Sequence, residues 1–208
     1  MPKYILHYFP INGRAIIPRA LLSYVKADWE NDVIKMEDWP KTKKSGLWEY
    51  EQLPVLEVDG KKYSQSHAIN IYLGQTFNLM GKDKEEDYQI NNILIAFEDY
   101  TLPIWDAMYN QDPAKKAELK PKAEEKFKFY VKKKKKKYTE LGKGKYYLGE
   151  KFTLADIALT TTLLDDIDTL GLKEEILKEL APNLYELIKR VKENELKEFF
   201  EKIFVKFG

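Results

Sequence analysis

The sequence predicts an α+β segment in the order βαβ–ββα, followed by an all-helical segment. Strand-like patterns are confined to the first ~80 residues, and the remainder shows only helical spacing of apolar residues. A polar stretch at Met80–Asp87 separates the two parts. We therefore expect two domains, residues 1–79 and 83–208, joined by a linker at 80–82.

The first half has signals for each of its elements. A dense apolar run favours a buried first strand, and the Asp59-Gly60 pair between two strand-like runs is typical of a β-hairpin. Ser66 is a residue type favoured at a helix N-cap. The expected elements are, in order, a strand at Lys3–Phe9, a helix at Ala15–Tyr24, a strand at Asp28–Lys35, a hairpin over Gln52–Ser66 and a helix from Ser66 to Tyr72.

Apolar residues recur at helical spacing through the second half. One helix start is marked twice, because Thr153 and Asp156 have the spacing of a capping box, and Phe152 and Ile157 that of a hydrophobic staple. This pattern is a folding signal and not a catalytic one. The expected helices lie at Tyr88–Tyr109, Ala123–Leu141, Phe152–Asp165 and Asn183–Phe200.

Six consecutive lysines, Lys132–Lys137, lie inside the second of these helices. Such a run indicates either a solvated helix face or an anion-binding patch, and the solvated face is the simpler interpretation. On a helix the six point around the whole circumference. Lys134 falls beside the apolar stripe, so we expect its amine to reach water along an extended side chain.

Composition excludes several classes of function. The 208 residues include 35 basic and 34 acidic side chains, a balance that does not favour nucleic-acid binding over the whole surface. Cysteine is absent, which removes disulfides, zinc–cysteine sites and thiol nucleophiles. With His7 and His67 as the two histidines, a zinc site or a Ser-His triad is also not expected.

The sequence shows neither a signal-peptide pattern nor an apolar run of about 18 residues, so we expect a cytoplasmic protein without a membrane span. Any thiol chemistry must use a thiol that a ligand brings.

The first half carries features suited to a small anionic peptide. If the Leu53-Pro54 bond is cis, the main chain of Leu53 can pair with an extended ligand as an added strand would. Gln65-Ser66 at a helix start suits a carboxylate. Arg14 opens a helix beside Tyr8, and two further residues, Trp39 and Lys43, follow the second strand.

Four motifs carry a family resemblance over almost the whole chain: "YILHYFPINGRA", "EDWPKTK", "QLPVLEVDGKKYSQSHAINIYLG" and "FTLADI". Together and in this order they resemble the sigma-class glutathione S-transferases. That family includes glutathione-dependent prostaglandin D synthases and lens S-crystallins. The resemblance implies a thioredoxin-like N-terminal domain, an all-helical C-terminal domain, a homodimer and glutathione as co-substrate.

The resemblance also implies residue roles. Tyr8 would donate a hydrogen bond to the glutathione sulfur; Tyr4, in register on the same strand, is the alternative. The remaining glutathione-binding residues would be Arg14, Trp39, Lys43, Gln52, Leu53, Pro54, Gln65 and Ser66, together with Asp99 from the partner subunit. Phe9, Trp105 and Tyr109 are candidates for the pocket of a hydrophobic electrophile.

The chain departs from the family pattern at several places. Asn12 and Ile16 replace residues of an R-G-R-A-E-like turn, and the loop before Gln52 is longer by a segment around Trp48–Glu51. The C-terminal "FFEKIFVKFG" does not resemble the family's usual ending. The prostaglandin D synthases of the family bind a divalent metal through an acidic cluster at the dimer interface. Here the apolar Ile95 stands one turn before Glu98 and Asp99, so no metal is expected.

Three readings remain open from the sequence. The first is a conjugating enzyme, which could also reduce peroxides. The second is a prostaglandin D synthase, and the third is a non-catalytic glutathione-binding or structural relative. The absent cysteine and the lysine-rich helix are also compatible with an engineered or reconstructed sequence.

Overall fold

The computed structural model describes residues 2–141 and 144–205. It divides into two compact units. The first contains residues 2–80 and Glu195–Val205, and the second contains Gly81–Asn194 apart from residues 142–143. Within the described residues, no helix is both long enough and apolar enough to cross a bilayer. The α+β order of the first half and the helical second half confirm the expected fold class.

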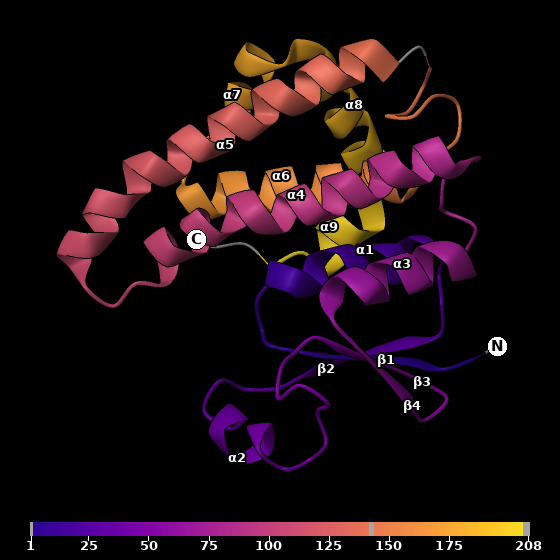
Figure 1. Cartoon of the computed structure of the whole chain (residues 1–208), viewed down its shortest axis with the longest axis vertical. Coiled ribbons are helices and arrows are strands. Elements are labelled where there is room, and N and C mark those ends of the chain that lie inside the picture. The colour runs from indigo at the N-terminus through magenta and orange to yellow at the C-terminus, as the bar shows by residue number, and fades with distance from the viewer. Residues whose placement is uncertain (1, 142–143, 206–208) are drawn as a thin grey trace. The chain divides into compact units, whose positions relative to one another are not determined.

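The first unit is built on a four-stranded mixed sheet with strand order β2-β1-β3-β4. β1 pairs in parallel with β2 and antiparallel with β3, and β3 pairs antiparallel with β4. Helices α1 and α3 lie side by side on one face of the sheet (Figure 1). The elements are β1 (Tyr4–Tyr8), the 3-10 turn η1 (Gly13–Ala15), α1 (Ile16–Tyr24), β2 (Trp29–Val33), α2 (Trp39–Lys43), β3 (Val55–Val58), β4 (Lys61–Ser64), α3 (Ser66–Thr76) and α9 (Lys197–Lys202).

Alternation along β1 places its residues. Tyr4, Leu6 and Tyr8 are buried, and Ile5 and His7 are half-buried, since successive side chains of a strand point to opposite faces. The expected hairpin is confirmed. Asp59 and Gly60 both have positive φ angles, of 48° and 85°, the pattern of the two-residue turn whose twist matches that of the strands.

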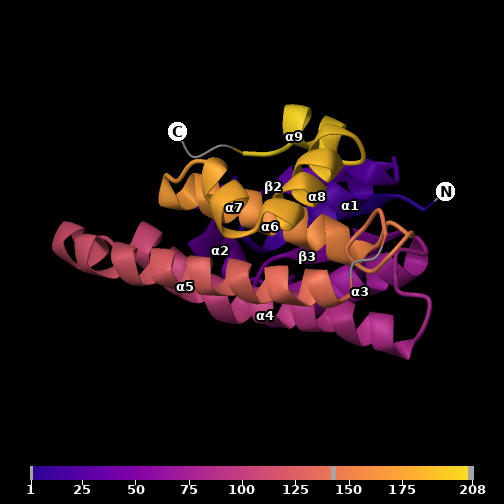
Figure 2. The ribbon, with the colours of Figure 1, turned by 90° about the horizontal axis from the view of Figure 1, so that it is seen from above.

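The second unit is a helical bundle in which α4 and α5 run side by side (Figure 2). Nearly every residue of α6 is buried, so this helix forms the centre of the unit. Its start has the capping box that the sequence predicts. The helices are α4 (Lys84–Tyr109), α5 (Pro113–Leu141), α6 (Leu154–Leu170), α7 (Glu175–Leu180) and α8 (Pro182–Glu193).

Several boundaries differ from the sequence expectation. α4 begins four residues early, where the Asp83 carboxylate caps the helix by accepting from the Glu86 N–H. The single helix expected over Asn183–Phe200 is wrong. α8 ends at Glu193 because Asn194 leaves the helical region with φ −119° and ψ −82°. α9 then begins at Lys197 and belongs to the first unit.

Lys134 also differs from the expectation. Its side chain does not extend to water: the residue is 6% exposed, and its Nζ donates to Asn92 Oδ1 over 3.2 Å. The amine lies 5.0 Å from the centre of the Tyr130 ring. Burial lowers the pKa of Lys134 to about 8, and the neighbouring Lys137 charge adds to this effect.

Candidate functional site

The sheet topology brings several predicted residues to one end of the sheet. In the register, His7 pairs with Val55, and Val55 pairs with Ser64. Tyr8 follows the first of these residues, Leu53-Pro54 precedes the second, and Gln65-Ser66 follows the third. Because β1, β3 and β4 are neighbours in the sheet, these segments lie side by side at one end of the strands. The predicted peptide-binding elements therefore share one end of the sheet.

Tyr8 is held by the turn that follows it. The Arg14 backbone N–H donates to the Tyr8 hydroxyl oxygen over 3.1 Å. This bond uses a lone pair of the hydroxyl, and it polarises the O–H so that its proton becomes a stronger donor. Tyr8 is 5% exposed, and its main-chain carbonyl accepts from the Ile34 N–H over 2.8 Å. Tyr8 is therefore held both at its main-chain carbonyl and at its hydroxyl oxygen.

The buried cation beside Tyr8 is Arg19, which the sequence reasoning missed. Its guanidinium carbon lies 5.6 Å from the centre of the Tyr8 ring. The guanidinium donates to Asn31 Oδ1 and to the carbonyls of Phe9 and Ile11. It is 2% exposed. The sequence did carry a signal for Arg19, because it stands within the apolar stretch "IIPRALL". An arginine buried in such a stretch must have hydrogen-bond acceptors close by.

Aromatic rings connect the end of β1 to the loop after β2. The Phe9 and Trp39 rings meet edge to face at 5.4 Å, and Trp39 lies 6.4 Å from Trp48. Trp48 is 6% exposed and also contacts His7, at 5.3 Å. The inserted loop thus supplies the packing behind Trp39. Lys43, at the last position of α2, is exposed.

The remaining predicted residues of the first unit flank the hairpin. The Leu53–Pro54 peptide bond is cis, Leu53 is buried, and Gln52 is exposed. Gln65 has φ +72° and ψ 111°, a conformation that costs a non-glycine residue about 1–3 kcal/mol and recurs at functional sites. Gln65 is the N-cap of α3 and Ser66 its first residue, so the expectation of Ser66 as N-cap is shifted by one.

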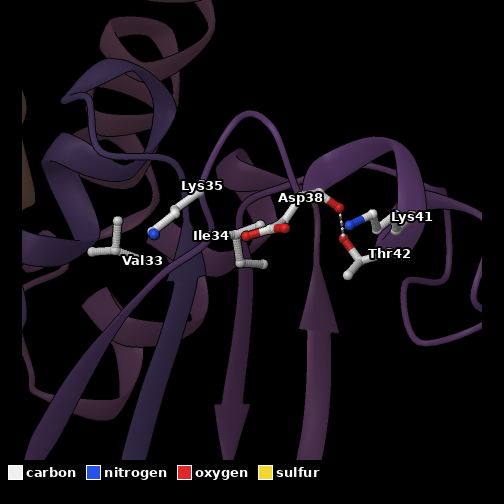
Figure 3. A pocket seen from close by; sticks show the side chains of 6 residues that line it. All are labelled: Val33, Ile34, Lys35, Asp38, Lys41 and Thr42. Carbon is white, nitrogen blue, oxygen red and sulfur yellow. Dashed lines mark hydrogen bonds between the residues drawn. The ribbon is translucent and has the colours of Figure 1, made fainter.

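A pocket of about 380 Å³ opens beside α2 (Figure 3). The Thr42 hydroxyl at its wall donates to the Asp38 carbonyl over 3.4 Å. None of the predicted site residues lines this pocket, and no sequence pattern indicated it. Its lining residues are Val33, Ile34, Lys35, Asp38, Lys41 and Thr42.

Three predicted residues lie in the second unit, on α4. Asp99 is exposed, Tyr109 is 44% exposed, and the half-buried Trp105 packs edge to face on Phe97 at 6.3 Å. Their roles toward a ligand stay predictions.

Comparison with known proteins identifies the family. Residues 5–75 match the glutathione S-transferase N-terminal domain, and residues 98–202 match the glutathione S-transferase C-terminal domain. The chain belongs to the glutathione S-transferase family. Its first unit has the thioredoxin-like arrangement of that family's N-terminal domain, with a helical domain after it.

Individual glutathione S-transferases and related enzymes are similar to the chain. Probable glutathione S-transferase 6 of Caenorhabditis elegans is 30% identical over 87% of this chain and 89% of its own length. Glutathione S-transferase 2 of Manduca sexta is 41% identical over 56% of each chain. The chain thus spans only about half the length of that relative. The solved prostaglandin synthase D of Nilaparvata lugens superposes with a TM-score of 0.80, at 31% identity, over 98% of this chain and all of its own.

Proposed function

We propose that this protein is a glutathione transferase that conjugates the glutathione thiolate to small hydrophobic electrophiles. One observation carries the proposal: the Tyr8 hydroxyl, held at 3.1 Å by the Arg14 N–H, lies at the same end of the sheet as Leu53-Pro54 and Gln65-Ser66. This arrangement combines a phenol donor with places for an extended peptide and its carboxylate.

The chemistry follows from thiol acidity. A free thiol has a pKa of about 8.5, so glutathione is mostly protonated at neutral pH. The Tyr8 O–H donates to the sulfur and favours the thiolate, since a hydrogen bond to the charged form lowers a pKa. A decrease of about two units corresponds to about 2.7 kcal/mol. The sulfur lone pair then forms the S–C bond, and the leaving group departs with the electron pair of the bond that breaks.

The rest of glutathione is assigned by segment. Leu53 pairs with the cysteinyl backbone, with Pro54 and Gln52 beside it. Gln65 and Ser66 hold the γ-glutamyl carboxylate at the start of α3, where the positive end of the helix dipole favours an anion. Trp39 and Lys43 contact the glycyl end. Arg14 adds positive potential near Tyr8. Phe9, Trp105 and Tyr109 are proposed to line the electrophile pocket.

We further propose a homodimer that forms through α4. Every seventh residue along this helix is a large exposed apolar side chain: Tyr88, Ile95, Leu102 and Tyr109, which are 59%, 53%, 47% and 44% exposed. A row of this spacing lies on one helix face, and a second copy of the chain would cover it. Asp99 is exposed on the same helix and is proposed to reach the γ-glutamyl amine bound by the partner.

Sedimentation velocity tests the dimer. Leu102→Glu is expected to give a monomer, and Phe129→Glu, at an exposed residue of α5, is the control that stays dimeric. A wild-type monomer at micromolar concentration would contradict the dimer and remove Asp99 from the site.

Finer assignments also remain proposals. The four motifs and their order support the sigma class. A chain without cysteine has no disulfide that needs an oxidising compartment, which supports the cytoplasm. Prostaglandin D synthase is the second candidate, supported by the similarity to the Nilaparvata lugens enzyme. A non-catalytic glutathione-binding protein is the third.

A glutathione titration paired with a 1-chloro-2,4-dinitrobenzene conjugation assay tests the function. Tyr8→Phe is expected to lower kcat/KM about 100-fold near neutral pH, since it removes a charge-assisted donor. Tyr4→Phe is the matched control: Tyr4 is 3% exposed on the same strand and packs on Phe77 at 5.7 Å. Glutathione binding without turnover by the wild type would eliminate the conjugating enzyme. Equal losses in both variants would eliminate the assignment of Tyr8.

A further inference from the structure

The side chain of Asn12 is paired with the main chain close to the C-terminus. Its Nδ2 donates to the Val205 carbonyl over 2.6 Å, and its Oδ1 accepts from the Val205 N–H over 3.1 Å. The two residues are 193 positions apart. Asn12 is 1% exposed, so the pairing is shielded from water. A carboxamide presents a donor and an acceptor side by side, and this geometry uses both.

The segment that carries Val205 is itself held in place. α9 packs against α1 in the first unit, and Phe199 on α9 is 1% exposed. The Phe204 N–H donates to the Phe199 carbonyl over 2.9 Å. The Phe204 ring lies 5.1 Å from Phe200 and 6.1 Å from Phe199. Val205 is thus presented to Asn12 by an ordered support.

Asn12 also belongs to the turn that positions the phenol. Its carbonyl accepts from the Ala15 N–H over 3.0 Å, which closes the turn around Gly13 and Arg14. The Arg14 N–H in that turn donates to the Tyr8 hydroxyl. Arg14 follows Asn12 by two positions in the same turn. A shift of Asn12 would therefore also move the Arg14 amide that holds the phenol oxygen.

Both partners stand where this chain departs from the family pattern, at the "PIN" turn and at the C-terminal ending. We infer that Asn12 is a positioning residue for Tyr8, and that the C-terminal segment, through Val205, sets the aim of the phenol at the glutathione sulfur. This inference rests on the proposed function and deepens it. It assigns the C-terminal segment a role in thiol activation rather than in substrate selection.

The test measures the acidity of bound glutathione. Asn12→Asp places a carboxylate oxygen against the Val205 carbonyl, and Asn12→Ala removes the pairing without adding charge. In both variants, thiolate absorbance followed against pH is expected to show the pKa of bound glutathione raised by about one unit, and kcat/KM below that pKa lowered about tenfold. The glutathione Kd, measured at a pH below the pKa of the bound thiol, is expected to stay within about twofold, because the thiol is then protonated and the carboxylate-binding segment at Gln65-Ser66 is untouched.

Two comparisons separate positioning from folding. Asn183→Asp makes the same charge change at an exposed residue of α8 and is expected to leave the thiol pKa unchanged. A chain truncated after Ile203 is expected to show the raised thiol pKa, and adding Asn12→Ala to it is expected to have little further effect, since both changes remove one interaction.

The outcomes are decisive in either direction. An unshifted thiol pKa in folded Asn12→Ala would overturn the inference, as would full additivity of the two changes. A wild type without thiolate absorbance in the presence of glutathione would overturn the proposed function itself, whereas normal wild-type absorbance with unchanged variants would overturn the inference alone.

Discussion

Gly13 packs directly against the Tyr8 hydroxyl: a Cβ at this glycine would lie 2.7 Å from the phenol oxygen. No side chain fits at that distance unless the phenol moves, and Gly13 also has φ +40°, a conformation that glycine adopts without strain. The position of the phenol and the choice of glycine therefore depend on each other. Chemistry at Tyr8 should be sensitive to a single methyl group here.

Gly13→Ala is expected to lower kcat/KM for conjugation about tenfold or more by displacing the phenol, and to lower the free energy of unfolding by about 1–2 kcal/mol through backbone strain. Gly46→Ala is the matched control, because Gly46 has φ +81° with nothing within 4 Å of its Cβ position. It should lose a similar amount of stability with no loss of rate. Equal rates for the two variants in steady-state assays would contradict the prediction.

Trp48→Ala is expected to raise the KM for glutathione about five- to tenfold, because Trp39 loses the ring that packs on it at 6.4 Å. The cavity should also lower the free energy of unfolding by about 3–5 kcal/mol. Tyr50→Ala changes a 55% exposed aromatic of the same loop and should alter neither quantity beyond about 0.5 kcal/mol. An unchanged KM in folded Trp48→Ala would show that Trp39 does not need this support.

Lys134→Met is expected to stabilise the protein below pH 8. The pKa of Lys134 is lowered from 10.5 to about 8 by burial. Below that pH the folded chain carries the full cost of a buried charge, up to about 3 kcal/mol. Between pH 8 and 10.5 only the unfolded chain holds the proton, so wild-type stability rises with pH and the advantage of the variant shrinks.

Urea unfolding at two pH values, one below 8 and one above 10, tests this window. Lys136→Met, at an exposed residue of the same run, is the control and should change little at either pH. A destabilised Lys134→Met variant would mean that the bond from Nζ to Asn92 contributes more than the burial of the charge costs.

Asp156→Ala is expected to lower the free energy of unfolding by about 2–4 kcal/mol. The Asp156 carboxylate accepts from the Tyr147 N–H at 2.8 Å, the Thr153 N–H at 2.9 Å and the Thr153 hydroxyl at 3.1 Å. Burial raises the pKa of Asp156 to about 6, against the lowering effect of these bonds. The folded carboxyl thus binds its proton more tightly than the unfolded one. The stabilisation that Asp156 provides is then largest at low pH. The difference in the free energy of unfolding between wild type and Asp156→Ala should therefore decrease from about pH 4 to 6.

Thermal unfolding across that pH range measures this difference. The control is Glu150→Ala, a substitution at an exposed residue just before the capping box. A gap that widens from pH 4 to 6 would reverse the predicted sign.

Elements with strong local signals were predictable from the sequence. The period-two burial of β1, the Asp59-Gly60 turn and the Thr153–Asp156 capping box depend on residues within one strand, turn or helix start. The short helices α2 and α7 were not found, because five or six residues do not establish a helical period. The break at Asn194 was missed since apolar spacing continues past it into α9.

The candidate site shows the same division. The sequence motifs indicated Tyr8, Leu53-Pro54 and Gln65-Ser66. The strand register shows that all three lie at one end of the sheet. The sequence named Arg14 as the cation near Tyr8. That role of the Arg14 side chain stays a proposal; the structure adds a hydrogen bond from the Arg14 backbone N–H to the phenol and a buried guanidinium, that of Arg19, beside the Tyr8 ring. Spacing alone did not indicate Arg19, because its acceptors on Phe9, Ile11 and Asn31 are brought together only by the fold.

By itself, the sequence determined the order of strands and helices, the turn and cap chemistry, and the exclusion of any thiol of the protein's own. These depend on interactions between residues a few positions apart. Only the tertiary structure decided that Asn12 pairs with Val205, that Trp48 lies behind Trp39, and that Lys134 is buried. Such contacts join distant segments, and they are chosen by which surfaces pack together rather than by any local pattern.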